Sequence, residues 1–234
     1  MKTAFRSCLL GPVALGYGVI GRMRNLIAAA LIVAGGAAAA EPVTVAALGD
    51  SLTQGYGLPQ GDGFVPRLQA WLAANGADAE IVNAGVSGDT TAGGLARIDW
   101  TLTPEVDALI VTLGGNDLLR GIDPATSRAN LEAILTKAAE RDLPVLLIGM
   151  EAPGNYGPDY KVEFDAIYPD LAQRFGTLFA EGFFAPLMQD GADPAALTPF
   201  MQPDGIHPNA EGVAKIVEGL GPKVLDLIAQ AQSS

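Results

Sequence analysis

The feature that most constrains the fold of this chain is a regular alternation of short apolar runs with longer amphipathic stretches. The runs that begin at Val43, Ala108 and Val145 are unbroken, which is typical of strands covered on both faces of a sheet. Repeated strand, helix, strand units fold into a parallel sheet with helices on both faces, so an α/β sandwich of three layers is expected. The pattern predicts strands at residues 43–48, 80–84, 108–113, 145–150 and 182–184. Helices are predicted at residues 64–75, 91–102, 127–141, 161–175 and 209–232.

The composition is that of one folded domain without a basic surface. The 234 residues are 49% apolar and 17% charged, which is enough apolar material to bury one core. The formal net charge of -12 offers no basic surface to a phosphate backbone or an anionic membrane. We therefore expect no nucleic-acid partner.

The first 40 residues have the layout of an export signal peptide. They hold four basic residues and no acidic one, and they end in an apolar run at residues 26–40. Ala38 and Ala40 satisfy the small-x-small rule for signal peptidase, so cleavage is expected before Glu41. The alternative is a membrane anchor, but the 15 residues of this run are fewer than the roughly 20 that span a bilayer.

Removal of this signal would leave a domain at residues 41–234 that is periplasmic or secreted. That domain would keep ten basic and 26 acidic residues, a formal charge of -16, and would have no stable membrane anchor. The sole cysteine, Cys8, lies in the expected signal, so cysteine supplies neither a disulfide nor a metal ligand to the domain. The sequence leaves open whether translation starts at Met1 or at Met23.

Glycine-rich polar loops directly follow three of the predicted strands. Because the carboxyl ends of parallel strands meet at one edge of a sheet, the side chains of these loops can converge there, where ligands of open α/β sheets bind. The loops are Gly49-Asp50-Ser51-Leu52, Asn83-Ala84-Gly85 and Gly114-Gly115-Asn116-Asp117. A fourth loop, Asp204-Gly205-Ile206-His207-Pro208, opens the last predicted helix.

His207 is the only histidine in the sequence. A lone histidine is more often structural than catalytic, but this one follows Asp204 by three positions in a turn between Pro203 and Pro208. Such a turn can bring a carboxylate to Nδ1 of the ring and leave Nε2 free to accept a proton. With no second histidine, a metal site built from histidine ligands is excluded. We predict that Asp204 orients His207 as a general base.

Ser51 is the candidate nucleophile for this base. It stands just past a predicted buried strand in a glycine-flanked turn, although Asp50 and Ser51 could instead only cap a helix. Acyl transfer also needs donors for an oxyanion, which the backbone N–H of Gly85 and the side-chain amide of Asn116 can supply. The structural alternatives are a tight turn at Gly85 and a loop-capping amide at Asn116.

Other residues near this edge are expected to support the site without reacting. We interpret Asp50, Asp89 and Asp117 as acceptors for backbone N–H groups of the loops rather than as reactants. Four apolar loop residues are expected to contact the acyl chain of a substrate, with ordinary loop packing as the alternative: Leu118, Leu119, Pro153 and Tyr156.

Four blocks of the sequence resemble those of the SGNH hydrolase superfamily, also called GDSL esterases and lipases. The blocks are Gly49-Asp50-Ser51-Leu52, Gly85, Asn116, and Asp204 with His207. Three further segments, at residues 86–91, 114–121 and 155–157, are similar to the bacterial arylesterase, acyl-CoA thioesterase and lysophospholipase branch. The resemblance covers nearly all of the mature chain.

This resemblance implies a flavodoxin-like five-stranded parallel sheet in the order 2-1-3-4-5, with no metal or organic cofactor. It implies a triad of Ser51, His207 and Asp204. The oxyanion donors would be Ser51, Gly85 and Asn116. The expected partners are small-molecule esters and thioesters, namely aryl esters, fatty acyl thioesters and lysophospholipids, and the expected assembly is a monomer or weak dimer.

Two other functions fit parts of the pattern. Asp50, at the end of the first strand, also suits a receiver-like phosphoacceptor module, but the export signal and a missing lysine near the last strand argue against it. A metal phosphatase would use several aspartates of the edge, yet Asp50-Ser51-Leu52 lacks the second aspartate that such a nucleophile usually has. Within the esterase class, an acetylated carbohydrate is the alternative substrate.

Overall fold

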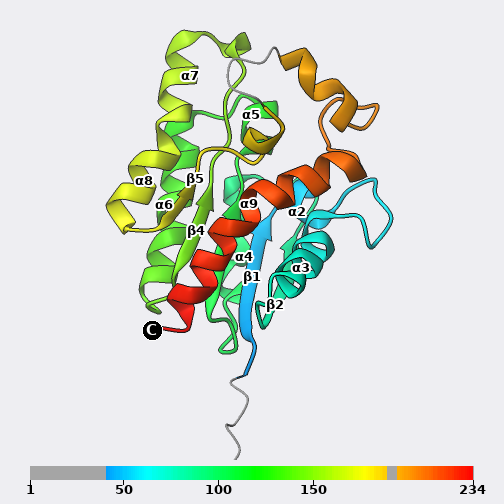
Figure 1. Cartoon of the computed structure of the whole chain (residues 1–234). Helices are drawn as coiled ribbons and strands as arrows, with labels where there is room; N and C mark the ends of the chain where they lie inside the picture. The colour runs from blue at the N-terminus through cyan, green and yellow to red at the C-terminus, as the bar shows by residue number, and fades with distance from the viewer. Residues whose placement is uncertain (1–40, 189–193, 234) are drawn as a thin grey trace, which may run out of the picture. The chain divides into compact units, whose positions relative to one another are not determined.

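A parallel sheet of five strands forms the centre of the domain (Figure 1). The computed structural model describes residues 41–188 and 194–233. The strands lie in the order β2-β1-β3-β4-β5, and every neighbouring pair is parallel, which confirms the predicted sheet. They are β1 (Val43–Gly49), β2 (Ala79–Gly85), β3 (Ala108–Thr112), β4 (Val145–Ile148) and β5 (Leu178–Ala180).

Helices cover both faces of the sheet, which completes the predicted three-layer sandwich (Figure 1). On one face α3 packs against α9, and on the other α4 packs against α6. The α-helices are α2 (Ser51–Gln54), α3 (Phe64–Ala74), α4 (Thr91–Thr101), α5 (Gly115–Leu119), α6 (Pro124–Ala139), α7 (Pro158–Asp165), α8 (Ile167–Phe175) and α9 (Ala210–Ala231). Three 3-10 helices are η1 (Gly154–Tyr156), η2 (Ala185–Leu187) and η3 (Pro194–Phe200).

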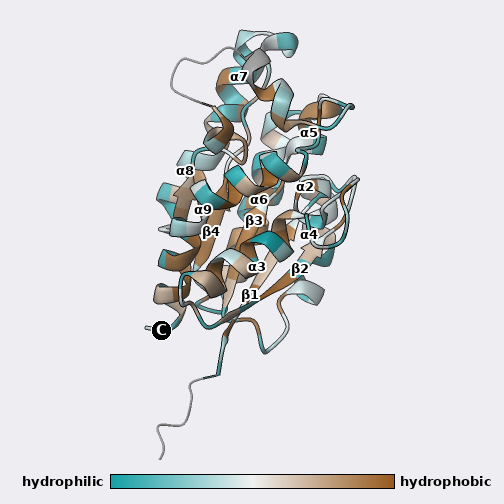
Figure 2. Ribbon diagram, turned by 45° about the vertical axis from the view of Figure 1, so that its right-hand side comes forward, coloured by the Kyte–Doolittle hydropathy of each residue, from teal (hydrophilic) through white to brown (hydrophobic). Residues whose placement is uncertain are grey.

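The central strands are buried on both faces, as their unbroken apolar runs predict. Residues 45–48 of β1, 108–111 of β3 and 146–148 of β4 have no solvent exposure. Figure 2 shows these strands as a hydrophobic layer between amphipathic helices. The edge strand β2 differs, because its first four residues alternate between buried and exposed. Burial on both faces therefore holds β1 and β3 in place, and these strands lead into the loops of Ser51 and Asn116.

The fifth strand is β5, so the prediction of a strand at residues 182–184 is wrong. Gly176 closes α8 in the left-handed conformation, with φ of 66°, and the chain enters the sheet two residues later. Ala180 already pairs with the last residue of β4, so the ladder ends there. Residues 182–184 lead into a turn in which Phe183 is buried in the core.

The helix predicted at residues 161–175 consists of two helices, α7 and α8, that meet at Ala166. Pro169 lies in the first turn of α8. It has no backbone N–H to donate to the carbonyl of Asp165, four residues earlier, so a continuous helix loses a hydrogen bond there. The helical spacing of apolar residues continues across this break, so the sequence pattern predicted a single helix.

Helix α6 begins at Pro124, three residues before the predicted start. Asp123 caps it by accepting a hydrogen bond of 2.8 Å from the N–H of Ala125. Proline at the first helical position needs no hydrogen-bond partner for its nitrogen, so Asp123-Pro124 is a strong start signal that apolar spacing alone does not contain.

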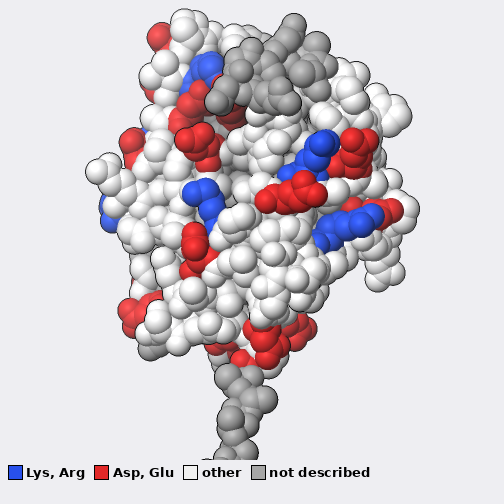
Figure 3. All heavy atoms as spheres, in the orientation of Figure 1, with Lys and Arg blue, Asp and Glu red and all other residues white. Residues whose placement is uncertain are grey.

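The described residues show neither a membrane-spanning helix nor a basic face in the view presented. Within residues 41–188 and 194–233, no helix is both long enough and apolar enough to cross a bilayer. On the face seen in Figure 3, Lys and Arg side chains are scattered, and most lie beside Asp or Glu. That part of the described surface offers no continuous basic patch to a phosphate backbone.

The carboxyl group of Asp117 joins three helices beneath the edge of the sheet. It lies in α5, is fully buried, and accepts hydrogen bonds from the N–H of Thr91 at 2.8 Å and from its hydroxyl at 2.6 Å. The hydroxyl of Ser127 in α6 donates a third, at 2.8 Å. Because Thr91 begins α4, one side chain holds α4, α5 and α6 together.

Asp117→Asn is expected to lower the free energy of unfolding by about 2–3 kcal/mol, because an NH2 group would face donors where an oxygen now accepts. Urea denaturation followed by circular dichroism measures this loss. The matched control is Asp99→Asn, which removes an exposed ion pair with Lys137 and should cost about 0–1 kcal/mol. Equal stability of the two variants would contradict the role given to Asp117.

Candidate active site

The loops that carry the candidate residues converge because three strands end level with one another. Gly49, the last residue of β1, is paired with Gly85 of β2 and with Thr112 of β3. Ser51 therefore begins α2 beside Gly85, and α5 with Asn116 starts just past β3. The structure brings all of these to one edge of the sheet, as the sequence predicts.

His207 reaches this edge from the far end of the chain. Its Nε2 lies 2.8 Å from Oγ of Ser51, 156 residues away in sequence, and its Nδ1 lies 2.7 Å from Oδ2 of Asp204. The three side chains thus form one continuous line of hydrogen bonds. Such a line can carry a proton from the hydroxyl to the ring while the carboxylate holds the ring's tautomer.

Asp204 is held as an anion by the turn in which it lies. Its Oδ1 accepts hydrogen bonds from the N–H groups of His207, at 3.0 Å, and Ile206, at 2.9 Å. The backbone N–H and ring of His207, followed by the N–H of Ile206, lower the pKa of Asp204 to about 2. Gly205 has φ of 68°, a conformation that this tight turn requires and that glycine adopts without strain.

The position of Ser51 follows from the cap of α2. Asp50, not Ser51, is the capping residue, since its Oδ1 accepts a 3.0 Å hydrogen bond from the N–H of Leu52. Ser51 is then the first helical residue, and its hydroxyl is directed to His207. A side chain at Gly49 would overlap Thr53, so the glycine lets α2 pack tightly on the strand end.

Gly85 and Asn116, the candidate oxyanion donors, flank Ser51 and have partners of their own. The N–H of Gly85 donates to Oδ1 of Asn83 at 3.0 Å, and Nδ2 of Asn116 donates to Oδ2 of Asp50 at 3.2 Å. The amide of Asn116 has a second hydrogen that this bond leaves available. A side chain at Gly85 would collide with the backbone of α2, so only glycine brings its N–H this close.

Two of the three aspartates at the edge behave as predicted. Asp50 and Asp117 accept hydrogen bonds from backbone N–H groups, which confirms their interpretation as loop-fixing acceptors. Asp50 is 1% exposed, and its burial raises its pKa to about 6 against the opposing hydrogen bonds from Leu52 and Asn116. Asp89 accepts instead from Nε of Arg97, at 2.6 Å.

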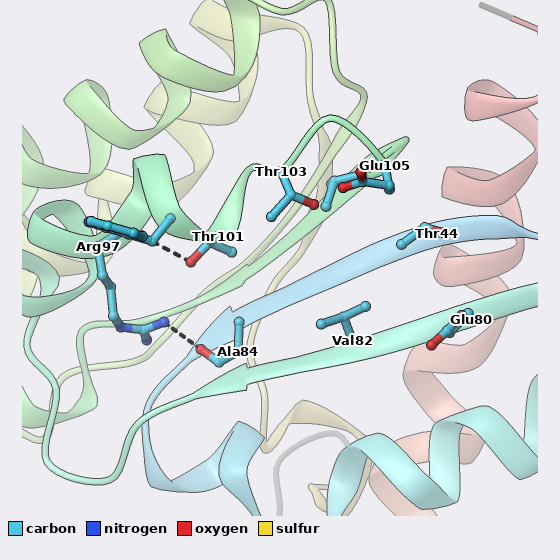
Figure 4. A pocket seen from close by; sticks show the side chains of 10 residues that line it. Thr44, Glu80, Val82, Ala84, Arg97, Thr101, Thr103 and Glu105 are labelled. Atoms are coloured by element: carbon cyan, nitrogen blue, oxygen red, sulfur yellow. Dashed lines mark hydrogen bonds between the residues drawn. The ribbon is translucent and has the colours of Figure 1, made fainter.

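Arg97 is a supporting residue that the sequence patterns did not identify. From α4 it donates to the carbonyl of Ala84 at 2.7 Å and to that of Gly49 at 2.8 Å, so it ties together the ends of β2 and β1. Figure 4 shows the arginine beside a groove along β2 that holds none of the predicted site residues. Besides the ion pair with Asp89, its side chain contacts backbone carbonyl groups, which leave no local motif.

The predicted substrate contacts occupy different environments. Leu119 and Tyr156 are exposed at 58% and 42%, and the hydroxyl of Tyr156 lies 3.5 Å from the carbonyl of Leu119. Pro153 is also exposed, whereas Leu118 is 7% exposed and packs in the core. A further exposed aromatic residue, Tyr56, was not predicted, and its ring centre lies 4.7 Å from that of His207.

No metal site is evident in the part of the chain that the structure describes. Over residues 41–188 and 194–233, no three or more His, Cys, Asp or Glu side chains are grouped so that they could hold a metal ion. The groups that the hydrogen bonds bring together at this edge are a hydroxyl, an imidazole and a carboxylate, with N–H donors beside them.

Comparison with known proteins gives consistent results. The model of the GDSL-like Lipase/Acylhydrolase family matches residues 47–215. The chain is 39% identical over 186 residues to "Esterase TesA" of Pseudomonas aeruginosa, covering 79% of this chain and 89% of the relative. It is 35% identical over 195 residues to "Thioesterase 1/protease 1/lysophospholipase L1" of Escherichia coli K12, covering 82% and 87%.

Solved structures agree with these sequence matches. The fold is similar to that of AlinE4, described as an SGNH-hydrolase family esterase, with a TM-score of 0.65, 42% identity, and coverage of 80% of this chain and 96% of that one. A crystal structure of TesA matches with a TM-score of 0.70 and 37% identity over 79% of this chain and 99% of that one. The family match begins within β1 and spans most of the domain, including β2 to β5, so the chain belongs to the GDSL-like lipase/acylhydrolase family.

Proposed function

We propose that this enzyme hydrolyses carboxylic esters and thioesters through an acyl-enzyme formed on Ser51. The observation that carries the proposal is the unbroken line of hydrogen bonds from Oγ of Ser51 through both ring nitrogens of His207 to Asp204. Membership of the family supports hydrolysis of ester bonds as the type of reaction. A hydroxyl becomes an effective nucleophile when an adjacent base takes its proton, and this arrangement meets that need.

In the first half of the reaction, Oγ of Ser51 attacks the carbonyl carbon while Nε2 of His207 accepts the hydroxyl proton. The tetrahedral intermediate carries a negative oxygen, which the N–H groups of Ser51 and Gly85 and the amide of Asn116 stabilise. His207 then donates the proton to the departing alcohol or thiol, and the acyl group stays on Ser51. Asp204 remains ionised and stabilises the imidazolium.

In the second half, water replaces the alcohol or thiol as the partner of His207. The ring takes a proton from the water, whose oxygen attacks the acyl carbon, and the second intermediate collapses with return of the proton to Oγ of Ser51. For either intermediate, the oxyanion must share the N–H of Gly85 with Asn83 or displace that side chain. The free amide hydrogen of Asn116 needs no such rearrangement.

The proposed substrates are aryl esters, fatty acyl thioesters and lysophospholipids. Relatives named as an esterase, as a thioesterase and lysophospholipase, and as an arylesterase of Vibrio mimicus support this range. The exposed side chains of Leu119, in α5, and Tyr156, in η1, supply apolar surface in the connections that follow β3 and β4, at the same edge as Ser51. Apolar surface there would stabilise an acyl or aryl group rather than a sugar.

Ser51→Ala is expected to abolish covalent labelling by a fluorophosphonate and to lower kcat for aryl acetate by about four to six orders of magnitude, because no other group replaces the nucleophile. Labelling is followed by intact-protein mass spectrometry, and turnover by product absorbance. Palmitoyl-CoA and lysophosphatidylcholine are assayed in parallel, and loss of all hydrolysis with the same substitution assigns them to one site.

Ser87→Ala is the matched control for this substitution. The Ser87 hydroxyl lies at the same edge and donates to Gln54, 3.0 Å away, and the control should label at the rate of the unchanged enzyme. A Ser51→Ala protein that still labels and turns over would overturn the mechanism.

Asp204→Asn is expected to lower kcat by about two to four orders of magnitude, because an amide neither fixes the tautomer of His207 nor stabilises its charged form. The pKa of Asp204 is about 2, so its carboxyl is ionised from pH 5 to pH 9, and the ratio of kcat in the two enzymes should show the loss at every pH in that range. Turnover of aryl acetate at each pH measures the ratio.

The depressed pKa of Asp204 also predicts the direction of a stability effect. A carboxyl whose pKa falls on folding stabilises the fold above its unfolded pKa, and this contribution is lost as the pH falls from about 4 towards 2.

Turnover of the Asp204→Asn enzyme within a few-fold of normal would show that another group orients His207.

We infer further that the protein is exported and that residues 1–40 are removed. This segment lies outside the described residues, and the inference depends on its four basic residues, its apolar run and the small residues Ala38 and Ala40. Mass spectrometry of the protein recovered from a periplasmic extract should give a chain that begins at Glu41. A protein found only in the cytoplasm with residues 1–40 intact would refute export.

A further inference from the structure

The proposed triad joins two segments that have few other hydrogen bonds to each other. Ser51 lies in α2, whereas Asp204 and His207 lie in the loop before α9. Among the residues that the structure describes, two hydrogen bonds cross between residues 50–63 and residues 200–209. One is the contact of His207 with Ser51 itself, and the other links Gln202 to Tyr56. Gln202 is thus the one structural link of this kind that is independent of the reacting groups.

The side chain of Gln202 spans both segments. Its Nε2 donates to the carbonyl of Tyr56 at 2.9 Å and to the carbonyl of Pro208 at 3.0 Å. Its backbone N–H donates to the carbonyl of His207 at 2.7 Å. The carbonyl groups of His207 and Pro208 are therefore both held by one residue, which also holds Tyr56 in the segment that follows Ser51.

The chemistry of these contacts requires a glutamine. Both side-chain partners are carbonyl oxygens, which accept only, and a primary amide offers two hydrogens on one nitrogen to satisfy them. A side chain at Gly57 would overlap the amide of Gln202, so the loop after α2 carries a glycine where the glutamine lies against it. The partner of the link, Tyr56, also places its ring 4.7 Å from the ring of His207.

We propose that Gln202 is a positioning residue that sets the distance between Nε2 of His207 and Oγ of Ser51. This inference rests on the proposed function, because it assigns Gln202 to the alignment of that base and nucleophile. Without the Gln202 link, the hydrogen bond between Ser51 and His207 would be the only one of the two that still joins these segments. Small misplacements of reacting groups are costly in enzymes, so the effect should fall on the chemical step.

Gln202→Met keeps the length and volume of the side chain and removes both donors. We expect kcat for aryl acetate and the rate of fluorophosphonate labelling of Ser51 to fall together by about 10- to 100-fold, with KM changed by less than about threefold. Gln202→Asn retains the amide on a shorter side chain and should show the same pattern. If the methionine variant does not fold, the asparagine variant decides by the same measurements.

Gln69→Met is the matched control. Gln69 also links two elements through its amide, donating to the carbonyl of Ala79 and accepting from the N–H of Ile81, both at 2.8 Å, but it joins α3 to β2 away from His207. This control should lose thermal stability while keeping kcat and the labelling rate within about twofold, since a part-buried amide link contributes to stability wherever it lies.

A spectroscopic measurement separates positioning from general destabilisation. His207 is the only histidine, so an untagged protein with 15N-labelled imidazole gives a single set of ring signals. In the Gln202 variants the proton on Nδ1 should exchange faster with water than in the unchanged enzyme, because the ring is less firmly held against Asp204. In Gln69→Met this exchange should be unchanged.

The outcomes distinguish this inference from the function on which it rests. Gln202 variants with normal kcat, labelling and ring signals would refute the positioning role while labelled Ser51 still supports the mechanism. An equal loss of kcat in Gln69→Met would also refute it, since general destabilisation would then account for the effect. Absence of labelling at Ser51 in the unchanged enzyme would instead refute the proposed function.

Discussion

The hydrogen bond between Oγ of Ser51 and Nε2 of His207 is the contact on which the proposed site depends. The sheet makes this contact possible because it positions the loop of Ser51. The two residues are 156 positions apart and 2.8 Å apart in space. Level strand ends, fixed by the pairing of Gly49 with Gly85 and Thr112, bring the Ser51 loop and the proposed oxyanion donors together. The loop before α9 then has only to place one ring against them.

Buried and part-buried polar groups tie the segments of this edge together. Asp50 holds α2 by its cap and also accepts from Asn116, while Arg97 ties the carbonyls at the ends of β1 and β2. Burial of a carboxyl is unfavourable unless donors surround it, and the raised pKa of Asp50, about 6, reflects that cost. Asp204, which lies in a turn with three donors, keeps its charge instead. The two environments fit a structural role for Asp50 and the orienting role that we propose for Asp204.

The sequence predicted what is encoded locally. Unbroken apolar runs predicted β1, β3 and β4, and a single histidine three residues after Asp204 pointed to the residue that lies beside Ser51. It failed at β5, a three-residue strand determined by pairing with β4, and at the break near Pro169, which apolar spacing does not reveal. Arg97, Tyr56 and Gln202 were missed because their contacts to distant segments leave no motif.

A crystal structure of the mature chain after reaction with an ethyl fluorophosphonate tests the central claim most directly. The account predicts phosphorus bonded to Oγ of Ser51, with the phosphonyl oxygen within hydrogen-bonding distance of the N–H groups of Ser51 and Gly85 and of Nδ2 of Asn116. Nε2 of His207 should lie beside the Ser51 oxygen. Phosphorus bonded to any other residue, or a phosphonyl oxygen directed away from all three donors, would contradict it.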